Sequence, residues 1–320
     1  MQKNTLSLLI TYYNEKELFT ECMESIAVQT VYPDELLIYD DCSPFPAIDY
    51  IPANFSIPYR IIRGTINNGS PAVGRNILMQ EAQSDYLHFQ DADDLLKTDC
   101  IQKIKDALVK EKFDVIINEV EACKDGQLIH HNHVKVDKIK ELGAVVFGIK
   151  YCYPTQSITF RKDIMNTVAG FWGNEYLSAS EDYEFFARLM YEIKSYHIIE
   201  DNLVIYRLKN QSRNADFENW AAATLQAVDL LAKHLPQKYN RLLAERANMV
   251  GVSLYSRQFY TKAKEAFGYA NTLSKNAIDA TEYSMLYKYL VPVIGIYNTL
   301  RISKIYQNIF PQKIRQLLKK

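Results

Sequence analysis

Cysteine is scarce in this sequence, and long apolar runs are missing from it. The five cysteines are odd in number and scattered, and no two of them form a CxxC pair. The segment Met1–Asn4 shows no signal-peptide pattern, so we expect reduced thiols in a cytoplasmic protein. No uninterrupted apolar stretch reaches the roughly 20 residues that a bilayer-crossing helix needs. The sequence therefore predicts a chain that does not span a membrane.

A large net charge of either sign is also missing. The 320 residues include 37 Lys and Arg against 38 Asp and Glu, which gives a formal net charge of −1. Such a chain has no overall field to attract nucleic acid, so we expect no nucleic-acid partner. The hydrophobic share of 48% and the charged share of 23% are typical of a folded globular protein. This length allows one large domain or two modest ones.

The first 110 residues alternate strand and helix patterns. This alternation predicts an α/β fold with a mostly parallel sheet and helices on its faces. Ligands of such sheets bind beyond the carboxyl ends of the strands, so the polar residues that follow the strands should meet in one crevice. The expected strands are Thr5–Thr11, Glu35–Tyr39, Pro58–Arg63 and Asp85–Gln90, and the expected helices are Glu15–Gln29 and Ser70–Ala82.

The pattern changes further along the chain. Short strands and one helix continue as far as residue 213, and from residue 214 helical periodicity rich in Ala, Leu and Lys takes over. We therefore expect a separate all-helical region over 214–320. The expected elements are paired strands Lys112–Ala122 and Gln127–Val136 around the tight turn Lys124–Gly126, strand Gln156–Arg161, helix Glu181–Tyr191, strand Tyr196–Ile205, and helices Trp220–Leu235, Lys238–Arg257 and Tyr260–Leu273.

Three carboxylates follow the strand pattern Asp85–Gln90. Asp91, Asp93 and Asp94 are costly to bury unless they are paired or bound to a cation, and hard divalent ions take oxygen ligands. The alternative is a solvated acidic turn before the next helix, with Asp94 or Thr98 as the N-cap. The three residues alone leave both interpretations open.

Acidic residues are absent from the last segment, 283–320, which carries seven basic residues among apolar and aromatic ones. This combination suits a helix that lies in an anionic membrane interface. The alternative is a last helix that packs its apolar face on the protein and keeps its lysines in water. Pro292, Gly295 and Pro311 predict two or three short amphipathic pieces rather than one long helix.

A series of short motifs runs from Ser7 to Arg213. The motifs are Thr11–Glu15, Gln29-Thr30, Asp40–Ser43, Asn67–Gly69, Gly74–Asn76, Asp91–Asp94, Phe160-Arg161, Gly170-Phe171, Glu181-Asp182 and Tyr206-Arg207. In this order and at these spacings they resemble those of the family 2 glycosyltransferases, inverting enzymes of the GT-A fold that use nucleotide-sugar donors. The resemblance implies a Rossmann-like, nucleotide-diphospho-sugar transferase domain over 1–213, followed by a helical extension with a basic tail over 214–320.

The resemblance also implies which residues bind the donor. Tyr13 is expected to stack on the base, although a tyrosine that closes the edge of the core is the alternative. Asp41 is expected to accept a hydrogen bond from a pyrimidine imide, which distinguishes uracil from cytosine. The expected donor-binding residues are Thr11, Tyr13, Asn14, Asp41, Arg75, Asp91 and Arg207. Lys209 and Arg213 are further candidates to bind the diphosphate. The alternative for Arg207, Lys209 and Arg213 is an ordinary basic surface loop.

The metal ligands and the catalytic base follow from the same resemblance. Asp93 is expected to bind Mg²⁺ or Mn²⁺ directly, and Asp91 to lie beside the ribose or the metal. Asp182 is expected to be the base that removes a proton from the acceptor hydroxyl as it attacks the anomeric carbon, so that a single displacement inverts the configuration. The alternative for Glu181-Asp182 is a pair of acidic residues that complement a helix dipole.

Two other features have weaker claims. In His130–His133 neighbouring strand residues point to opposite faces, so at most two imidazoles could share an ion, and we expect no zinc there. Trp172 is expected either to stack on an acceptor sugar or to pack beside Phe171.

The sequence as a whole predicts a metal-dependent inverting glycosyltransferase that uses a UDP-sugar. The resemblance implies an acceptor hydroxyl on a cell-surface polysaccharide or lipid-linked oligosaccharide, and a peripheral location at the inner face of the cytoplasmic membrane. One rival is a sugar nucleotidyltransferase, which needs a glycine- and lysine-rich phosphate loop that Thr11–Glu15 does not resemble. The other is a non-catalytic relative that binds nucleotide sugar or glycan as a scaffold, and intact Asp91, Asp93 and Asp182 argue against it.

Overall fold

The computed structural model describes residues 4–129, 135–172, 177–208, 217–279 and 285–309. The chain forms two compact units, Met1–Ala223 and Thr224–Lys320. The predicted domain boundary at 213/214 lies in a segment, 209–216, outside the described residues. Within the described ranges we find no helix whose length and hydropathy together would let it cross a bilayer.

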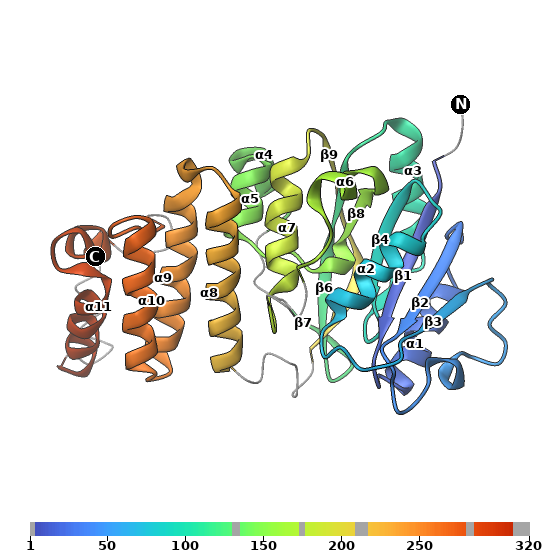
Figure 1. Ribbon diagram of the computed structural model, residues 1–320, viewed down its shortest axis with the longest axis horizontal. Coiled ribbons are helices and arrows are strands. Elements are labelled where there is room, and N and C mark those ends of the chain that lie inside the picture. The colour runs from blue at the N-terminus through green and yellow to red at the C-terminus, as the bar shows by residue number, and fades with distance from the viewer. Residues whose placement is uncertain (1–3, 130–134, 173–176, 209–216, 280–284, 310–320) are drawn as a thin grey trace. The chain divides into compact units, whose positions relative to one another are not determined.

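A single mixed sheet forms the centre of the first unit (Figure 1). Its strand order is β3-β2-β1-β4-β8-β6-β9-β5, and β7 pairs with β6. The strands are β1 (Leu6–Tyr12), β2 (Glu35–Asp40), β3 (Arg60–Arg63), β4 (Tyr86–Asp91), β5 (Leu95–Leu96), β6 (Val115–Lys124), β7 (Gln127–Ile129), β8 (Ile158–Arg161) and β9 (Tyr196–Arg207). Every strand expected from the sequence has a counterpart, and the two-residue β5 is an addition. Of the expected strand Gln127–Val136 only Gln127–Ile129 is described as a strand, and residues 130–134 lie outside the described part of the chain.

Most strands of the sheet run in one direction. β3, β2, β1 and β4 run parallel, as predicted from the strand and helix alternation. β8 inserts antiparallel between β4 and β6, so β6 keeps the direction of β4, and β9 pairs parallel with β6. The expectation of a mostly parallel sheet is therefore confirmed. The predicted turn between β6 and β7 is confirmed, because Asp125 and Gly126 both have positive φ angles, 50° and 78°, as a tight hairpin requires.

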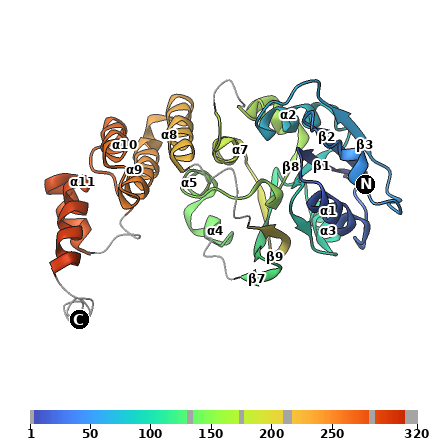
Figure 2. The same ribbon diagram turned by 90° about the horizontal axis from the view of Figure 1, so that it is seen from below.

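The helices of the first unit cover both faces of this sheet (Figure 2). On one face, α1 and α3 bury Phe19, Met23 and Ile104 against the β1 side chains Leu8 and Ile10. The other face is covered by α2, α5 and α7. These helices are α1 (Glu17–Ala27), α2 (Pro71–Glu81), α3 (Cys100–Lys110), α4 (Lys138–Leu142), α5 (Ala144–Lys150), α6 (Met165–Val168) and α7 (Glu181–Glu192).

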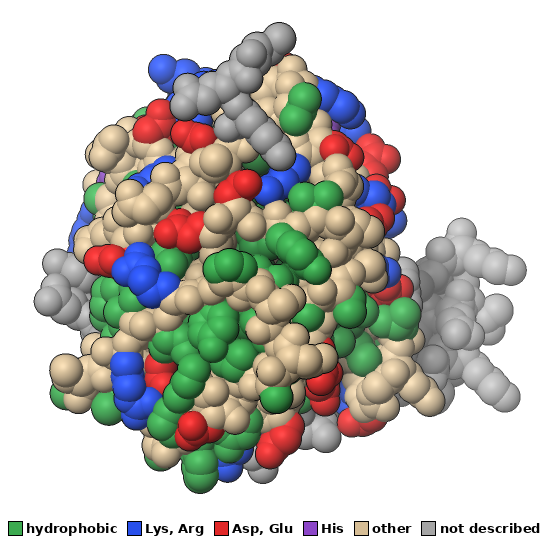
Figure 3. Space-filling model, turned by 90° about the vertical axis from the view of Figure 1, so that its right-hand side faces the viewer, with side chains coloured by type: hydrophobic (Ala, Val, Ile, Leu, Met, Phe, Trp, Pro, Cys, Tyr) green, Lys and Arg blue, Asp and Glu red, His purple; other side chains and the backbone are tan. Residues whose placement is uncertain are grey.

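The long segment between β2 and β3 closes one end of the sheet. It contains a 3₁₀ turn, Ala47–Tyr50, and packs Tyr50 and Phe55 against the core. Phe45 and Ile48 remain 43% and 53% exposed. Figure 3 faces this end of the sheet and shows apolar side chains gathered there among charged ones.

The second unit is helical, as predicted. Its helices are α8 (Phe217–His234), which begins in the first unit, α9 (Asn240–Ser256), α10 (Tyr260–Leu273) and α11 (Met285–Ile309). Gly251 of α9 lets α10 approach closely, because a Cβ there would meet the Phe267 ring at 2.4 Å. α11 breaks at Gly295, whose φ of 75° is not helical, so the expected interruption is confirmed at that residue.

Candidate active site

A cavity of about 310 Å³ opens where β1 and β2 end. Gly74 of α2 lies against it, and a Cβ at Gly74 would meet the Tyr39 ring at 2.5 Å, so only glycine lets this helix approach so closely. Ser70 caps α2 by accepting a hydrogen bond from the Ala72 amide, and Pro71 occupies the first turn. The cavity is lined by Thr11, Tyr12, Tyr13, Tyr39, Asp41, Asn67, Gly69, Ser70, Pro71 and Gly74.

Among the described residues, Asp41 is the only carboxylate that lines this cavity. It is 8% exposed and accepts two hydrogen bonds from Asn68, one from the amide nitrogen at 3.0 Å and one from Nδ2 at 2.5 Å. Tyr13 lies at the rim with 44% of its surface exposed, so its ring is accessible to a planar ligand. The structure therefore brings Thr11, Tyr13 and Asp41 together around one small cavity.

Asn14 lies apart from that lining. Its backbone amide donates to Oγ of Ser43 at 3.1 Å, and its φ of 65° is in the left-handed region that asparagine tolerates. Ser43 is in turn held by an Asp40 carboxylate oxygen, which accepts from its amide at 2.8 Å. In this arrangement Asn14 and Asp40 shape the loops around the cavity.

The three carboxylates after β4 form a compact acidic cluster. Oxygen atoms of Asp91, Asp93 and Asp94 all lie within 4.8 Å of one another. Thr11 is paired with Asp91 across the β1–β4 ladder and with Tyr39 across the β1–β2 ladder, so the cavity and the cluster lie on neighbouring strands. Oxygen ligands in this number and at this spacing fit a hard divalent cation.

Asp94 has an interior role, and its assignment as a helix cap was wrong. The next helix, α3, begins at Cys100 with Asp99 in the N-cap position. Asp94 is 1% exposed and accepts hydrogen bonds from Nε2 of Gln156 and, at 2.7 Å, from the amide of Arg207. Burial, followed by the charges of Asp93 and Asp91, raises the pKa of Asp94 well above its ordinary value. Asp91 and Asp93 are thus the partly exposed members that can face a metal.

Arg75 links the acidic cluster to the start of α7. Its guanidinium lies 3.0 Å from Oδ1 of Asp91 and 3.3 Å from Oε1 of Glu181, and the residue is 4% exposed. Burial disfavours the charge, but the carboxylates of Asp91, Glu181 and Asp182 outweigh that effect and raise the pKa of Arg75. The structure therefore places a permanent cation between the two predicted acidic motifs.

Asp182 is the second residue of α7. The helix begins after Ser180, which has a φ of 61° and makes no side-chain cap. One carboxylate oxygen of Asp182 accepts from the amide of Tyr183 at 2.7 Å, so the side chain lies at the amino end of the helix. This position is compatible both with a base and with the alternative of dipole complementarity.

Arg207 ties the acidic cluster to α1. Its guanidinium donates to the backbone oxygen of Asp93, to the side chain of Glu21 and, at 2.9 Å, to the backbone oxygen of Leu18. All three of its side-chain nitrogens thus have acceptors within the chain. Its predicted contact with the diphosphate stays a prediction, and Lys209 and Arg213 lie outside the described residues.

Two residues near the cluster had no assigned role in the sequence. Gln156, expected only as part of a strand, holds Asp94. Tyr206 lies beside the cluster, where burial, followed by the charges of Asp94, Asp91 and Asp93, raises its pKa. No local pattern marks Gln156, because its partner is 62 positions away.

The two weaker features have different outcomes. The His130–His133 run lies outside the described residues. Trp172 places its ring 4.0 Å from the guanidinium carbon of buried Arg188. Arg188 is held in place by Glu184 and by the backbone oxygen of Gly170, so Trp172 rests on a fixed cation.

Comparison with known proteins adds the family context. The model of Glycosyl transferase family 2 matches residues 7–169. A Haemophilus influenzae protein described as an uncharacterized glycosyltransferase is 25% identical over 72% of this chain and 76% of its own. The poly(ribitol-phosphate) beta-N-acetylglucosaminyltransferase TarS of Staphylococcus aureus is 20% identical over 76% of this chain and 43% of its own.

Two solved structures share the fold. The S. aureus TarS fragment 1-349 in complex with UDP superposes with a TM-score of 0.67 at 15% identity, over 96% of this chain and 93% of that one. The Pyrobaculum calidifontis mannosyltransferase PcManGT in complex with GDP-Man and Mn²⁺ gives a TM-score of 0.58 at 14% identity, over 91% of this chain and 79% of that one. At these identities the likeness establishes the GT-A-like fold.

Proposed function

The chain belongs to glycosyl transferase family 2, and from this premise we propose that it is a metal-dependent, inverting glycosyltransferase that uses a UDP-sugar. Family membership makes it a glycosyltransferase and leaves the nucleotidyltransferase rival without support. The metal, the donor nucleotide and the acceptor are the parts that we propose. Each rests on named residues of the crevice.

The observation that carries the proposal is the convergence of three motifs. The cavity that holds Asp41 and the acidic cluster lie on neighbouring strands, because Thr11 pairs with Asp91 across the ladder. Neighbouring strands are about 4.8 Å apart, so a nucleoside in the cavity would direct its diphosphate toward Asp91. Arg75 then connects Asp91 to Glu181, next to Asp182. The proposed sites for the nucleoside, the diphosphate and the base therefore follow one another, from the cavity past Asp91 to Asp182.

Asp91 and Asp93 would hold the divalent cation. Their carboxylate oxygens are partly exposed and lie within 4.8 Å of each other, which suits oxygen ligation. A bound Mg²⁺ or Mn²⁺ supplies Lewis-acid stabilisation of a diphosphate leaving group. Arg75 supports the arrangement by neutralising one oxygen of Asp91 and so fixing the direction of that carboxylate.

Asp182 would act as the base in a single displacement. The acceptor oxygen attacks the anomeric carbon, its proton passes to a carboxylate oxygen of Asp182, and the bond to the diphosphate oxygen breaks on the opposite side. This sequence inverts the anomeric configuration. Glu181, rather than Asp182, forms the ion pair with Arg75.

The donor and acceptor classes have support from relatives as well as from residues. Asp41 lines a small cavity with the exposed Tyr13 ring at its rim, which suits a uracil base, and the TarS fragment was solved in complex with UDP. TarS acts on poly(ribitol phosphate) by its description. We therefore propose a cell-surface polysaccharide, or a lipid-linked oligosaccharide that leads to one, as the acceptor.

A donor-hydrolysis assay tests this proposal. UDP-glucose, UDP-N-acetylglucosamine and GDP-mannose would be incubated with the full chain, with Mn²⁺, with Mg²⁺ or with EDTA. We expect hydrolysis of a UDP-sugar that needs the cation and that falls in Asp182→Asn. Hydrolysis that persists undiminished in EDTA would remove the metal from the account, and a preference for GDP-mannose would remove the uridine assignment.

We further propose that α11 contacts an anionic membrane surface. Its exposed side chains include the apolar Tyr289, Val293, Ile302 and Ile305, at 69%, 79%, 45% and 55% exposure, and the cationic Lys288 and Arg301. This pairing of apolar and basic residues suits adsorption at the inner face of the cytoplasmic membrane. The remaining basic residues of 310–320 lie outside the described part of the chain.

Liposome co-sedimentation tests the membrane contact. The full chain should pellet with vesicles that contain phosphatidylserine at low salt and lose binding as salt rises, because each basic residue near the surface contributes about 1 kcal/mol. Replacing Val293 and Ile302 with Gln should reduce pelleting while leaving donor hydrolysis unchanged. Equal pelleting of both proteins would mean that these side chains have no contact with the bilayer.

A further inference from the structure

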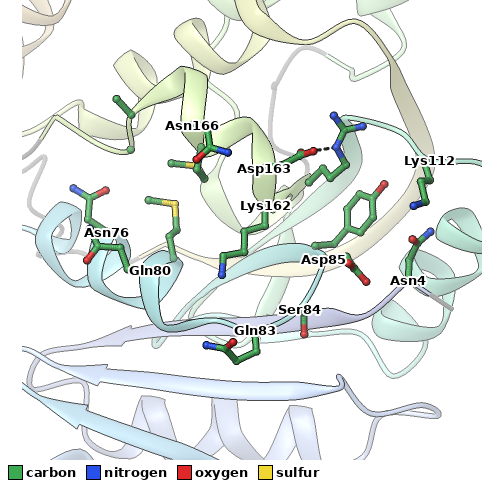
Figure 4. Close-up of a pocket in the computed structure, with 16 residues that line it drawn as sticks. Asn4, Asn76, Gln80, Gln83, Ser84, Asp85, Lys112, Lys162, Asp163 and Asn166 are labelled. Atoms are coloured by element: carbon green, nitrogen blue, oxygen red, sulfur yellow. Dashed lines mark hydrogen bonds and ion pairs between the residues drawn. The ribbon is translucent and has the colours of Figure 1, made fainter. Parts of the chain in front are cut away.

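A second cavity, of about 800 Å³, lies at the other end of the central strands, where β1 and β4 begin. It is bordered by Asn4, just before β1, and by Asp85 and Tyr86 at the start of β4 (Figure 4). The cavity lined by Asp41, which we propose for the donor and call the donor cavity, lies with the acidic cluster at the other ends of these strands. Asp91 of the cluster lies five positions after Tyr86, which at about 3.3 Å each gives roughly 16 Å along the strand. The two cavities are therefore distinct sites.

Carboxamides are the commonest side chains of the lining. Asn4, Gln80 together with Gln83, and Asn166 contribute amide groups from three separate segments. Figure 4 shows Lys162 extending across the middle, with Asn76 and Gln80 on one side and Asn4 and Lys112 on the other. A carboxamide both donates and accepts hydrogen bonds, as a sugar or polyol hydroxyl does. The lining therefore offers complementary groups to a hydroxylated chain.

The charges of the lining leave a cationic surplus. Arg161 is neutralised by Asp114 at 3.0 Å and Asp163 at 2.5 Å. Asp85 accepts from the amide and hydroxyl of Thr5, and these bonds together with the charge of Lys112 lower the pKa of Asp85. The ammonium of Lys162 donates to the backbone oxygen of Ala82 and has no carboxylate partner in the described part of the chain. An anionic group on the ligand would therefore meet Lys162.

Other ligand classes fit less well. A nucleotide base needs an aromatic face, but Tyr86, the aromatic residue of the lining, is fully buried and donates its hydroxyl to the backbone oxygen of Phe113 at 2.9 Å. A purely apolar ligand would bury the amides of Gln80 and Asn166 without partners. These two side chains make no hydrogen bond with any described residue and are exposed to the cavity.

Contacts of one wall of the cavity continue toward the acidic cluster. The side chain of Asn76 makes two hydrogen bonds with the backbone of Phe171. It accepts from the Phe171 amide and donates to the Phe171 backbone oxygen, both at 2.8 Å. The Phe171 ring lies 5.2 Å from the guanidinium carbon of Arg75. Arg75 in turn holds Asp91 and Glu181. A chain bound along this wall would therefore run past α2 toward the crevice.

We propose that this cavity binds an anionic, hydroxyl-rich segment of the polymeric acceptor, away from the hydroxyl that reacts. The proposal rests on the proposed function, since it presupposes a polymer as acceptor. A long chain reaches both sites, whereas a short oligomer reaches only the crevice. The cavity thereby gives the enzyme a preference for long acceptors.

The test compares long and short fractions of poly(ribitol phosphate), used as an anionic polyol probe. Their affinities for the full chain, with UDP present, would be measured by calorimetry at low salt. We expect Gln80→Lys to tighten and Gln80→Glu to weaken binding of the long fraction, by about two- to fivefold each, which is the range of exposed charge interactions. Binding of the short fraction should stay within the error of the wild type.

A variant without new charge and a matched control complete the design. Gln80→Ala combined with Asn166→Ala removes no internal contact among the described residues, and should weaken the long fraction by roughly tenfold through the loss of two hydrogen bonds. The controls are Gln127→Lys and Gln127→Glu, at an exposed glutamine of β7 outside the cavity. UDP-sugar hydrolysis should be unchanged in every variant.

Three results would overturn the proposal. They are a wild type that binds no long fraction, equal shifts for long and short fractions, and Gln127 variants that act like their Gln80 counterparts. Each can occur while UDP-sugar hydrolysis is intact, so the proposed function would stand. A wild type that hydrolyses no UDP-sugar would instead remove the proposed function itself.

Discussion

At the ends of β1 and β2 the donor cavity contains one carboxylate, Asp41, and both of its oxygens accept hydrogen bonds from Asn68. At the end of β4, by contrast, Asp91, Asp93 and Asp94 crowd within 4.8 Å of one another, and Glu181 and Asp182 add two more carboxyl groups nearby. The first region satisfies its polar groups with neutral partners. The second depends on two guanidinium groups, those of Arg75 and Arg207.

This difference teaches how the two regions contribute to binding. The donor cavity is complete as it stands, because its shape and hydrogen bonds are built by loops and by the glycine contact of α2. The acidic region has more carboxyl groups than cations among the described residues, and we propose that a divalent ion and a substrate balance them. We therefore expect changes on the acidic side to affect turnover, and changes in the donor cavity to affect nucleotide choice.

The largest effect should follow Asp93→Asn. Removing a charged ligand leaves the cation weakly held and the diphosphate uncompensated, so UDP-sugar turnover should fall below detection. Asp125→Asn, at the exposed tip of the β6–β7 hairpin, is a matched control and should keep full turnover. If Asp93→Asn keeps more than about a tenth of wild-type turnover at saturating Mn²⁺, Asp93 is not the metal ligand.

Asp182→Asn should lower turnover next most strongly. General-base assistance contributes on the order of 10²–10⁴-fold, while UDP affinity should stay close to normal because the donor cavity is unchanged. Pre-steady-state transfer and UDP calorimetry measure the two quantities. If the variant instead keeps its rate and loses only thermal stability, Asp182 stabilises the amino end of α7 and is not the catalytic base.

Arg75→Leu tests the comparison through the free energy of unfolding. It leaves Asp91 and Glu181 without their buried cation, so we expect a loss of about 2–4 kcal/mol in the free energy of unfolding, somewhat below the figure for fully buried pairs because Asp91 is partly exposed. Arg161→Leu is the control, since this arginine is 33% exposed and should cost at most about 1 kcal/mol. Equal losses in urea titrations would show that Arg75 is no more than a surface ion pair.

The smallest effect should come from the donor cavity. Asp41→Asn exchanges an acceptor for a donor opposite a uracil imide, and a hydrogen bond to a charged group contributes about 1.5–3 kcal/mol. UDP should therefore bind about tenfold more weakly, while CDP loses little. Competition between UDP and CDP measures this ratio. An unchanged ratio would mean that Asp41 only fixes Asn68.

Much of this organisation could be predicted from the sequence. The strands β1 to β4 and helices α1 and α2 follow hydrophobic periodicity and turn residues, and Ser70-Pro71 marks the start of α2. The motifs located Asp41, Asp91 and Asp93 because each lies at or just beyond the end of a strand. Local pattern and residue chemistry agree in this half of the fold, so prediction from neighbours in sequence works there.

The rest depends on partners that are distant in sequence. The insertion of β8 between β4 and β6 is a tertiary pairing that no local pattern encodes. The sequence suggested that Asp94 could cap a helix, because its actual partners, Gln156 and Arg207, are 62 and 113 positions away. Arg207 was expected to face the diphosphate, yet its guanidinium contacts come from Leu18, Glu21 and Asp93. Such contacts follow only from the folded arrangement.

The central claim is that the acidic region needs a divalent cation to bind the diphosphate. Calorimetric titration of UDP into the full chain, with and without Mn²⁺, tests it most directly, with Asp93→Asn and Asp41→Asn measured alongside. The account predicts that Mn²⁺ strengthens UDP binding in the wild type and in Asp41→Asn but not in Asp93→Asn. Equal UDP affinity of the wild type in Mn²⁺ and in EDTA would contradict it.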